Sequence, residues 1–367
     1  IRRPPRSTPL YSSAASDVYK RQVYRYASSM ITGQKNLITD VKGILVGNSH
    51  DDEVKTGVTV LTSDKRFAAS VSVLGGAPGT RETDLLESDR LVNEVDAIVL
   101  SGGSAFGLDA ASGVVECLKN KKKGYKVGNV NVPIVPAAIL FDLINGGNDD
   151  WDNNLYKNLG KSAYNNQSAD FKLGTFGAGY GATTSNLKGG LGSASIVLSN
   201  GVKVGAIVAV NPSGSVVTDG TNSFWASPYE ANKEFGGKNF APPNKIFSEY
   251  FRGDDNRKDM FSIKNTTIAI VATDLDLSKV ELKRVSVAAH DGISRAIVPS
   301  HTPYDGDLVF AVSTARRKIK IEQSDIYNIG HAASICLSRA IARGVYEATP
   351  SKNDTLPTWK EVENKRL

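Results

Sequence analysis

Two adjacent residues, Asn265 and Thr266, stand where a polar stretch of the sequence meets an apolar one. The segment SIKNTTIAIVATD (262–274) runs from polar residues into a strand that we predict at 267–273. Threonine suits strands, so a purely structural role is the simplest interpretation of Thr266. A chemical role would require a base beside its hydroxyl group, because a threonine hydroxyl is a weak nucleophile without one.

A break in the chain in front of Thr266 would supply that base. A free α-amino group has a pKa of about 7.7–8.0, and cleavage would place one on the same residue as the hydroxyl. The hydroxyl itself can attack the carbonyl of Asn265 and form an ester that water then hydrolyses. This reaction needs a strained, accessible junction between a flexible and a rigid segment, which is what the sequence predicts here.

Other chemistries find little support in the sequence. The segment GAGYG (177–181) is not G-x-G-x-x-G, and no Walker lysine pattern occurs, which argues against nucleotide binding. The histidines are scattered without metal-ligand spacing, and there is no G-x-S-x-G nucleophile elbow. We therefore expect neither a metal nor an organic cofactor.

Composition indicates a globular protein: of 367 residues, 40% are hydrophobic and 22% charged. No run approaches the length of a membrane helix, so we expect no membrane partner. Cys117 and Cys336 form neither a disulfide framework nor a zinc pattern, and we predict a reducing, cytoplasmic setting.

The basic charge is concentrated at one end of the chain. Residues 1–22 carry a net charge of +4 out of +6 for the whole sequence. No basic face with interleaved aromatic residues occurs elsewhere, so we expect no nucleic-acid partner. Residues 1–22 also lack an initiator methionine and any periodicity, and we interpret them as a non-native or disordered tail.

The remaining sequence predicts a mixture of strands and helices without regular alternation. We expect a helix at 105–119 with Ser104 as its N-cap and another at 155–164. A third begins at Ser278 with the capping box S-x-x-E, and a long helix covers 326–348. Strands are predicted at 57–61, 67–74, 97–100 and 267–273, with a hairpin turning at Asn200-Gly201, a hairpin-like segment at 301–312 and a loop at 221–264. The pattern favours one α+β domain with two sheets stacked between helix layers.

Four segments together resemble one enzyme family. They are NTTIAIVATD (265–274), AAHDGISRAI.P.HT..DGD..FAVST (288–314), GGAPGTRETDLL (75–86) and LSGGSAFGLDAASGV (100–114). In their order along the chain they are similar to the L-aminopeptidase/D-esterase family of self-cleaving N-terminal-nucleophile hydrolases, peptidase family S58. That family includes β-peptidyl aminopeptidases and nylon-oligomer (6-aminohexanoate oligomer) hydrolase. The resemblance implies a four-layer αββα sandwich, processing into chains 23–265 and 266–367, and a homo-oligomer, often a tetramer.

The resemblance also implies a set of catalytic residues. Thr266 matches the nucleophile, Asp305 and Asp307 match a pair of aspartates, and Lys188 and Asn211 match a lysine and an asparagine near the nucleophile. The carboxylates would hold the new ammonium group, and an opposite charge so placed raises its pKa. Lysine would balance their charge, and the asparagine side chain would donate to the developing oxyanion.

Each of these residues also has an ordinary structural interpretation. Asp305-Gly306 is a typical hairpin turn, Lys188 precedes two glycines as in a solvated loop, and Asn211-Pro212 can simply end a strand. One position departs from the nylon-oligomer hydrolase pattern, because Phe141 stands where that enzyme has a tyrosine, so a phenol contact to substrate or oxyanion is lost.

Taken together, the sequence predicts a self-cleaving amide hydrolase of short linear amides, with 6-aminohexanoate oligomers as expected substrates. An aminopeptidase acting on α- or β-peptides is the first alternative. An uncleaved binding protein is the second, and the self-cleaving acetyltransferases of arginine synthesis share this kind of fold.

Overall fold

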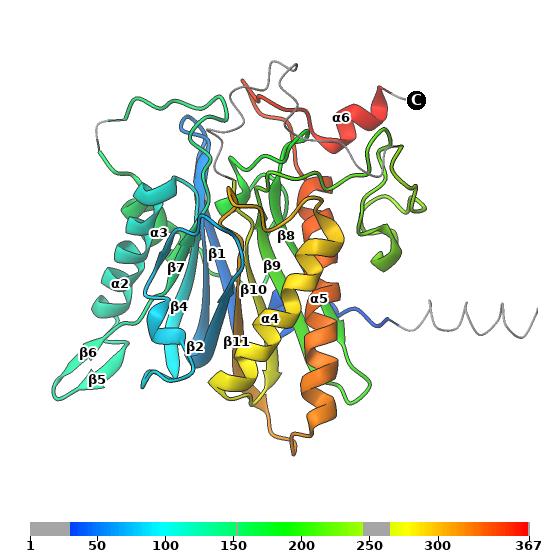
Figure 1. The fold of residues 1–367 in the computed structure, drawn as a ribbon. Helices are drawn as coiled ribbons and strands as arrows, with labels where there is room; N and C mark the ends of the chain where they lie inside the picture. Colours follow the sequence, from blue (N-terminus) through cyan, green and yellow to red (C-terminus); the bar gives the residue numbers. More distant parts are fainter. Residues whose placement is uncertain (1–29, 152, 245–264, 366–367) are drawn as a thin grey trace, which may run out of the picture. The chain divides into compact units, whose positions relative to one another are not determined.

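The computed structural model describes residues 30–151, 153–244 and 265–365 (Figure 1). The tail predicted at 1–22 and the second half of the loop predicted at 221–264 lie outside these residues. The described residues from Thr32 onward belong to one compact unit. None of the helices in this part of the chain is long and apolar enough to cross a bilayer.

Nine strands among the described residues form one mixed sheet in the order β3-β7-β4-β2-β11-β10-β9-β8, with β1 paired to β2 beside this path. Their bounds are β1 (Ile44–Asp51), β2 (Thr56–Val73), β3 (Thr80–Arg81), β4 (Glu94–Ser101), β7 (Ala137–Ile139), β8 (Gly190–Val197), β9 (Lys203–Val210), β10 (Ile268–Leu275) and β11 (Leu308–Arg317). A separate hairpin consists of β5 (Tyr125–Val127) and β6 (Val130–Val132).

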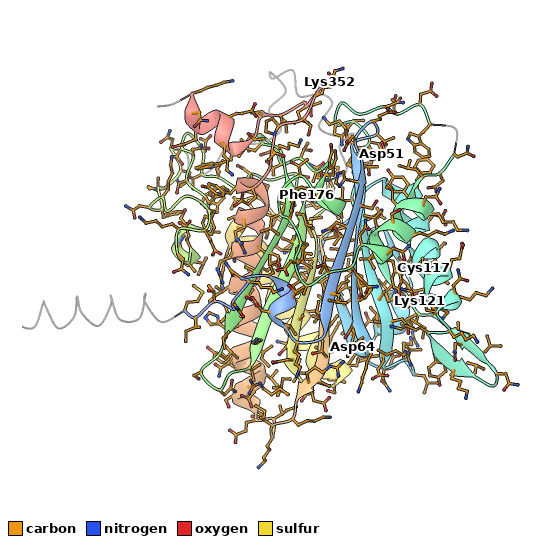
Figure 2. The ribbon with its side chains drawn as sticks, turned by 180° about the vertical axis from the view of Figure 1, so that it is seen from behind. Asp51, Asp64, Cys117, Lys121, Phe176 and Lys352 are labelled. Atoms are coloured by element: carbon orange, nitrogen blue, oxygen red, sulfur yellow. The ribbon has the colours of Figure 1, made fainter. Side chains whose placement is uncertain are left out.

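Helices cover the two halves of this sheet (Figure 1). α2 (Ala110–Asn120) and α3 (Tyr156–Asn165) pack on the half made of β1, β2 and β4. α4 (Lys279–Ala296) packs on β2 and β11, and α5 (Gln323–Tyr346) packs on β8 and β9. The short α6 (Trp359–Asn364) follows near the end of the chain. Cys117, labelled on α2 in Figure 2, and Cys336 on α5 are both free thiols.

Side chains that alternate along the strands explain the layers. On β4, Ala97 and Val99 face the core beneath α2 and α3, whereas Ile98 and Leu100 enter a separate core cluster. That cluster also receives Ile270 from β10, in the other half of the sheet. The two halves therefore pack face to face between helices, and the α+β class is confirmed.

The halves are continuous in hydrogen bonding, which differs from two separate stacked sheets. The connection is β2, which at 18 residues is long enough to belong to both. Its first part pairs with β1 and β4, and its second part, from Ala68 to Val73, pairs with β11. We predicted two strands here because the polar residues 63–66 interrupt the apolar pattern.

Local signals were confirmed where they depend on neighbouring residues. Ser278 accepts a hydrogen bond from the backbone nitrogen of Glu281 and completes the predicted capping box of α4. The hairpin β8–β9 turns at Asn200-Gly201 as predicted. Ser104, however, is not an N-cap: it has a positive φ of 52°, follows Gly103 at φ 83°, and starts a 3₁₀ segment that precedes α2.

The prediction of a hairpin-like segment at 301–312 was wrong, and the difference determines which residues meet at the site. β11 is a parallel neighbour of β10, with Ile268 opposite Leu308, and α4 forms the crossover between them. A parallel pair requires such a crossover, so Asp305-Gly306 does not turn a hairpin. The residues in front of both strands instead meet at one edge of the sheet.

Candidate active site

The register of three neighbouring strands assembles the site around Thr266. In β10, Ile268 lies opposite Leu308 of β11 and Ala209 of β9. Two residues before Ile268, the same register brings Thr266 beside Gly306 on one side and beside Asn211 on the other. The first pairing continues one residue further, because Asn265 and Asp305 form a parallel bridge.

Hydrogen bonds at the Asn265–Thr266 junction follow from this register. The backbone nitrogen of Thr266 donates to the backbone oxygen of Asn211 at 2.7 Å. The N–H of Gly306 lies 3.1 Å from Thr266 Oγ1 and 3.1 Å from the carbonyl oxygen of Asn265. The hydroxyl of Thr266 donates to that same carbonyl oxygen at 2.6 Å. One N–H group therefore faces both the hydroxyl and the carbonyl that a cleavage reaction would join.

The junction is more enclosed than we expected from the sequence. Thr266 is 4% and Asn265 7% exposed, and a Cβ added to Gly306 would lie 2.8 Å from Thr266 Oγ1. Such a distance is shorter than real Cβ contacts, so this position requires glycine. Solvent reaches the junction through a cavity that Asn265 lines.

The two predicted aspartates flank the junction. Asp307 accepts hydrogen bonds from the backbone nitrogen of Thr267 at 2.8 Å and from His301, through its backbone nitrogen at 3.0 Å and Nδ1 at 2.9 Å. Asp305 accepts from the backbone nitrogen and the hydroxyl of Ser213, both at 3.0 Å. Its other oxygen accepts from Thr302, at 3.2 Å from the nitrogen and 2.5 Å from Oγ1. Burial, and then the charge of Asp307, raise the pKa of Asp305.

These contacts change the role expected for the aspartates. The nitrogen of Thr266 is held by the Asn211 carbonyl, and the carboxylates bind the residues around it instead. Asp307 fixes the first peptide group after the nucleophile, and Asp305 fixes the segment that follows Asn211. Their negative charge still lies close enough to favour an ammonium group at Thr266.

Lys188 forms its ion pair with Asp354, a carboxylate other than the two predicted aspartates. Its Nζ is 2.8 Å from Asp354 Oδ2 and 3.0 Å from Ser351 Oγ. Lys55 Nζ is 2.5 Å from the other oxygen of Asp354. Both lysine side chains are 4% exposed. In this structure the charge of Lys188 is paired with Asp354 and anchors the C-terminal segment, and its balancing of Asp305 and Asp307 stays a prediction.

This ion-pair cluster perturbs its members in opposite directions. Burial lowers the pKa of Lys188, although the hydrogen bond that Lys188 donates to Asp354 opposes this effect. Burial alone would raise the pKa of Asp354, but hydrogen bonds from Lys188 and Lys55 lower it. The carboxylate therefore stays charged between two lysines.

The side chain of Asn211 does not point at the junction as an oxyanion donor. Its Nδ2 donates to the carbonyl oxygen of Phe141 at 3.0 Å, and its Oδ1 accepts from the nitrogen of Thr183 at 2.8 Å. Asn211 thus ties the strand end to two cavity walls, while the donor beside the scissile carbonyl is the N–H of Gly306.

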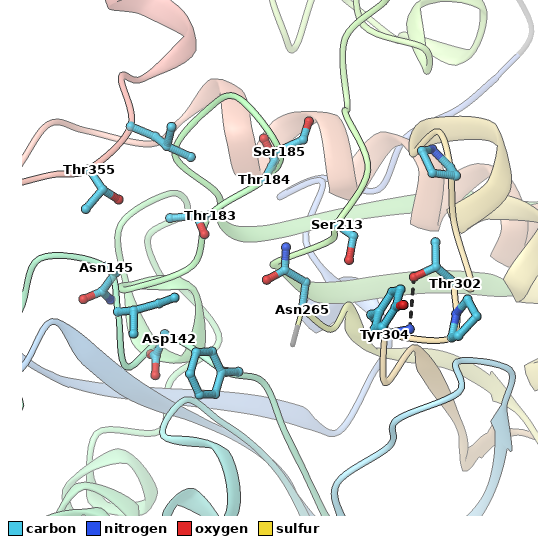
Figure 3. Close-up of a pocket in the computed structure, with 15 residues that line it drawn as sticks. Asp142, Asn145, Thr183, Thr184, Ser185, Ser213, Asn265, Thr302, Tyr304 and Thr355 are labelled. Atoms are coloured by element: carbon cyan, nitrogen blue, oxygen red, sulfur yellow. Dashed lines mark hydrogen bonds between the residues drawn. The ribbon is translucent and has the colours of Figure 1, made fainter. Parts of the chain in front are cut away.

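A cavity of about 450 Å³ opens beside the junction (Figure 3). Asn265 lies between Thr183 and Ser213 in this view. The walls combine apolar side chains with hydroxyl and amide groups, and they include Phe141, Ile144, Asn145, Tyr304, Thr355 and Leu356. Phe141 was predicted as a substrate-binding position, and it does line the cavity. The volume of this cavity suits a short linear ligand.

Sequence reasoning missed several residues of the site. His301 was set aside because histidines were searched for metal spacing, yet its ring binds Asp307. Gly306 contributes a backbone N–H, which no side-chain pattern reveals. Asp354 is 166 residues from Lys188 in the sequence, so no local pattern predicts their ion pair. Within the described residues, no group of three or more histidine, cysteine or acidic residues could hold a metal ion.

Two solved structures share the fold described above. A β-aminopeptidase from Burkholderia sp. superposes with a TM-score of 0.68 at 18% identity, covering 91% of this chain and 94% of that one. An L-aminopeptidase D-Ala-esterase/amidase from Ochrobactrum anthropi, described as a variant of the Ntn hydrolase fold, gives 0.65 at 20% identity over 91% and 94%. The fold is thus that of the N-terminal-nucleophile hydrolases.

Sequence comparison is more specific. The model of Peptidase family S58 matches residues 36–355, and the chain belongs to this family. The uncharacterized aminopeptidase Rv1333 of Mycobacterium tuberculosis is 38% identical over 345 residues, which cover 89% of this chain and 98% of that protein. The 6-aminohexanoate-oligomer endohydrolase of Kocuria sp. is 29% identical over 290 residues, covering 77% and 76%. The protein is a hydrolase that acts on amide or peptide bonds.

Proposed function

We propose that the protein cleaves its own chain between Asn265 and Thr266 and then hydrolyses short linear amides with Thr266 as nucleophile. The products of processing are an α-chain that ends at Asn265 and a β-chain, 266–367. The observation that carries this proposal is the N–H of Gly306, which faces both Thr266 Oγ1 and the Asn265 carbonyl oxygen.

Self-cleavage begins when Thr266 Oγ attacks the carbonyl carbon of Asn265. The N–H of Gly306 stabilises the negative charge that develops on the carbonyl oxygen, a type of contact worth about 3 kcal/mol. The C–N bond breaks, the nitrogen of Thr266 takes the hydroxyl proton, and an ester links the two residues. Water hydrolyses the ester and releases the hydroxyl beside a new amino group.

Turnover repeats these steps on a substrate. The amino group of Thr266 accepts the hydroxyl proton while Oγ attacks the substrate carbonyl. The leaving amine receives that proton, and an acyl ester remains on Thr266 until water hydrolyses it. The Asn211 carbonyl keeps the amino group in place, and Asp307 holds the following peptide group. Asp305 fixes Ser213 at the cavity wall.

The substrate proposed from the resemblance is a 6-aminohexanoate oligomer, the substrate named for the Kocuria relative. An aminopeptidase acting on α- or β-peptides is the alternative, supported by the names of the Mycobacterium and Burkholderia relatives. Rates on a 6-aminohexanoate oligomer, a β-alanyl amide and an L-alanyl amide distinguish the two. We further propose a cytoplasmic homo-oligomer of processed chains, such as a tetramer, which sedimentation would test.

A denaturing gel with mass spectrometry tests the central proposal. The wild-type protein is expected to yield a fragment beginning Thr266-Thr267-Ile268, and Thr266→Ala is expected to remain one chain and lose turnover by at least about 10³-fold. Thr266→Ser is the matched control, because it keeps the hydroxyl. A wild-type chain that stays intact would instead support an uncleaved binding protein. Acetyl transfer between acetyl-ornithine and glutamate would point to the acetyltransferase alternative.

A further inference from the structure

In the uncleaved chain, Asn265 occupies the position that the acyl part of a substrate must take. The same hydroxyl attacks both carbonyl groups, and the same N–H of Gly306 faces the carbonyl oxygen. Because one N–H cannot serve two acyl groups, the new terminus must leave before a substrate binds. The residues that contact Asn265 would therefore contact the acyl group of a bound substrate.

The side chain of Asn265 makes one informative contact there. Its Nδ2 donates to the carbonyl oxygen of Pro212 at 3.0 Å in a buried environment. A carbonyl oxygen only accepts hydrogen bonds, so the group that faces the Pro212 carbonyl must be a donor. The side-chain amide of Asn265 therefore points its nitrogen, and not its oxygen, at Pro212. The subsite thus presents an acceptor to whatever replaces the asparagine side chain.

The number of carbon atoms between the carbonyl carbon and the donor nitrogen defines which acyl group fits this subsite. Between the carbonyl carbon of Asn265 and its Nδ2 lie three carbon atoms, Cα, Cβ and Cγ. A 4-aminobutanoyl group has the same three carbons between its carbonyl and its amino nitrogen. An α-aminoacyl group has one such carbon and a 6-aminohexanoyl group has five, so their nitrogens fall short of Pro212 or reach past it.

The charges around the subsite favour an ammonium group. Asp305 accepts from the backbone nitrogen of Ser213, the residue that follows Pro212. No lysine or arginine is among the described residues that line the cavity, and Lys55 and Lys188 are bound to Asp354. An ammonium donor to the Pro212 carbonyl would form a charge-assisted hydrogen bond, which is stronger than the amide contact that it replaces.

We infer that the acyl subsite selects γ-aminoacyl groups such as 4-aminobutanoyl. The substrate ammonium group would donate to the Pro212 carbonyl from the position that Asn265 Nδ2 now occupies. This inference rests on the proposed function, since it assumes that Thr266 is the nucleophile of both reactions. Among the short linear amides proposed above, it favours 4-aminobutanoyl amides over both the 6-aminohexanoate oligomers and the α- or β-peptides named there.

A chain-length series of benzylamides tests the inference on the processed enzyme, with released benzylamine as the readout. The series contains glycyl, L-alanyl, β-alanyl, 4-aminobutanoyl, 5-aminopentanoyl and 6-aminohexanoyl benzylamide, with butanoyl benzylamide as the control without an amine. We expect kcat/KM to peak at 4-aminobutanoyl, at least about tenfold above the glycyl, 6-aminohexanoyl and butanoyl members. A peak at L-alanyl or 6-aminohexanoyl, or equal rates for butanoyl, overturns the inference.

Variants of the precursor give an independent readout that needs no substrate. Asn265→Asp keeps the size of the side chain but turns a carboxylate towards the Pro212 carbonyl, so we expect cleavage at least about tenfold slower than in the wild type. Asn265→Ala removes only the hydrogen bond and is expected to cleave faster than Asn265→Asp. Equal cleavage rates for Asn265→Asp and wild type contradict the inference. A wild-type chain that never splits before Thr266 contradicts the proposed function instead.

Discussion

The backbone nitrogen of Gly306 lies 3.1 Å from the hydroxyl oxygen of Thr266 and donates a hydrogen bond to it. Gly306→Ala would place a Cβ 2.8 Å from that oxygen and 2.6 Å from the Ala77 carbonyl. We expect the variant to fold but to cleave about 10–100-fold more slowly, because the N–H and the hydroxyl must move apart. The readout is the fraction of cleaved chain over time.

Gly330→Ala on α5 is the control for this substitution. A Cβ there would meet only the Ala288 Cβ, at 3.1 Å. It should cleave at the wild-type rate. If Gly306→Ala also does so, the N–H of Gly306 is not the donor that the reaction uses.

Asp354 should control substrate binding rather than self-cleavage. Asp354→Asn leaves two buried lysines without a carboxylate and loosens the segment whose Thr355 and Leu356 line the cavity. We expect KM to rise about tenfold, the free energy of unfolding to fall by about 3 kcal/mol, and cleavage to stay complete. Asp170→Asn, which breaks the exposed ion pair with Lys35, should change stability by less than about 0.5 kcal/mol. Loss of cleavage in Asp354→Asn would assign the cluster to the reaction itself.

His301 should act through Asp307. Its backbone has a positive φ of 55°, which asparagine tolerates well, and the asparagine amide can replace the Nδ1 donor to the carboxylate. We therefore expect His301→Asn to cleave at nearly the wild-type rate and His301→Ala to cleave roughly tenfold more slowly. Cleavage rates measured between pH 5 and 8 provide the comparison. Equal rates for the two variants would exclude a positioning role for the ring.

Burial of His290 should make stability depend on pH. Desolvation lowers its pKa from 6.5 to about 4; the charge of His301 also lowers it, whereas the Ser72 carbonyl, Asp307 and Asp291 oppose the shift. A lowered folded pKa means that the unfolded chain binds more protons, so stability is full above pH 6.5 and is lost as pH falls through 4. A shift of this size corresponds to about 3 kcal/mol.

The test compares urea unfolding of two single-chain proteins, Thr266→Ala with and without His290→Gln. Glutamine keeps a donor for the Ser72 carbonyl but does not titrate. Between pH 7 and 4 the parent should lose about 3 kcal/mol more than the double variant. Parallel pH curves would show that the pKa of His290 is the same in the folded and unfolded states.

Two features that depend only on adjacent residues could be predicted from sequence, whereas the N-cap at Ser104 and the features that depend on strand order could not. The capping box at Ser278 and the turn at Asn200-Gly201 act within a few residues, and both were confirmed. The parallel neighbour of β10 is set by packing of α4 over the sheet, so the segment before Leu308 was interpreted as a hairpin.

The same distinction holds at the site. The family resemblance named Thr266 and both aspartates as site residues, and the three lie together at one edge of the sheet. It did not give their partners, because Gly306 acts through its backbone and Asp354 meets Lys188 only in the folded chain. The contacts of Asn211 could not be predicted either, because its side chain forms hydrogen bonds with the backbone of Phe141 and Thr183, which are distant in the sequence.

The position of β10 has a consequence for the processed protein. This strand starts just after the proposed cleavage point, yet it lies between β9 of the first fragment and β11 of its own, and β11 in turn pairs with β2. The two polypeptides would stay interleaved through two backbone ladders without any covalent bond. Separating them would require breaking both ladders in the middle of the sheet, so we expect that the fragments of a processed molecule would not exchange with those of another copy.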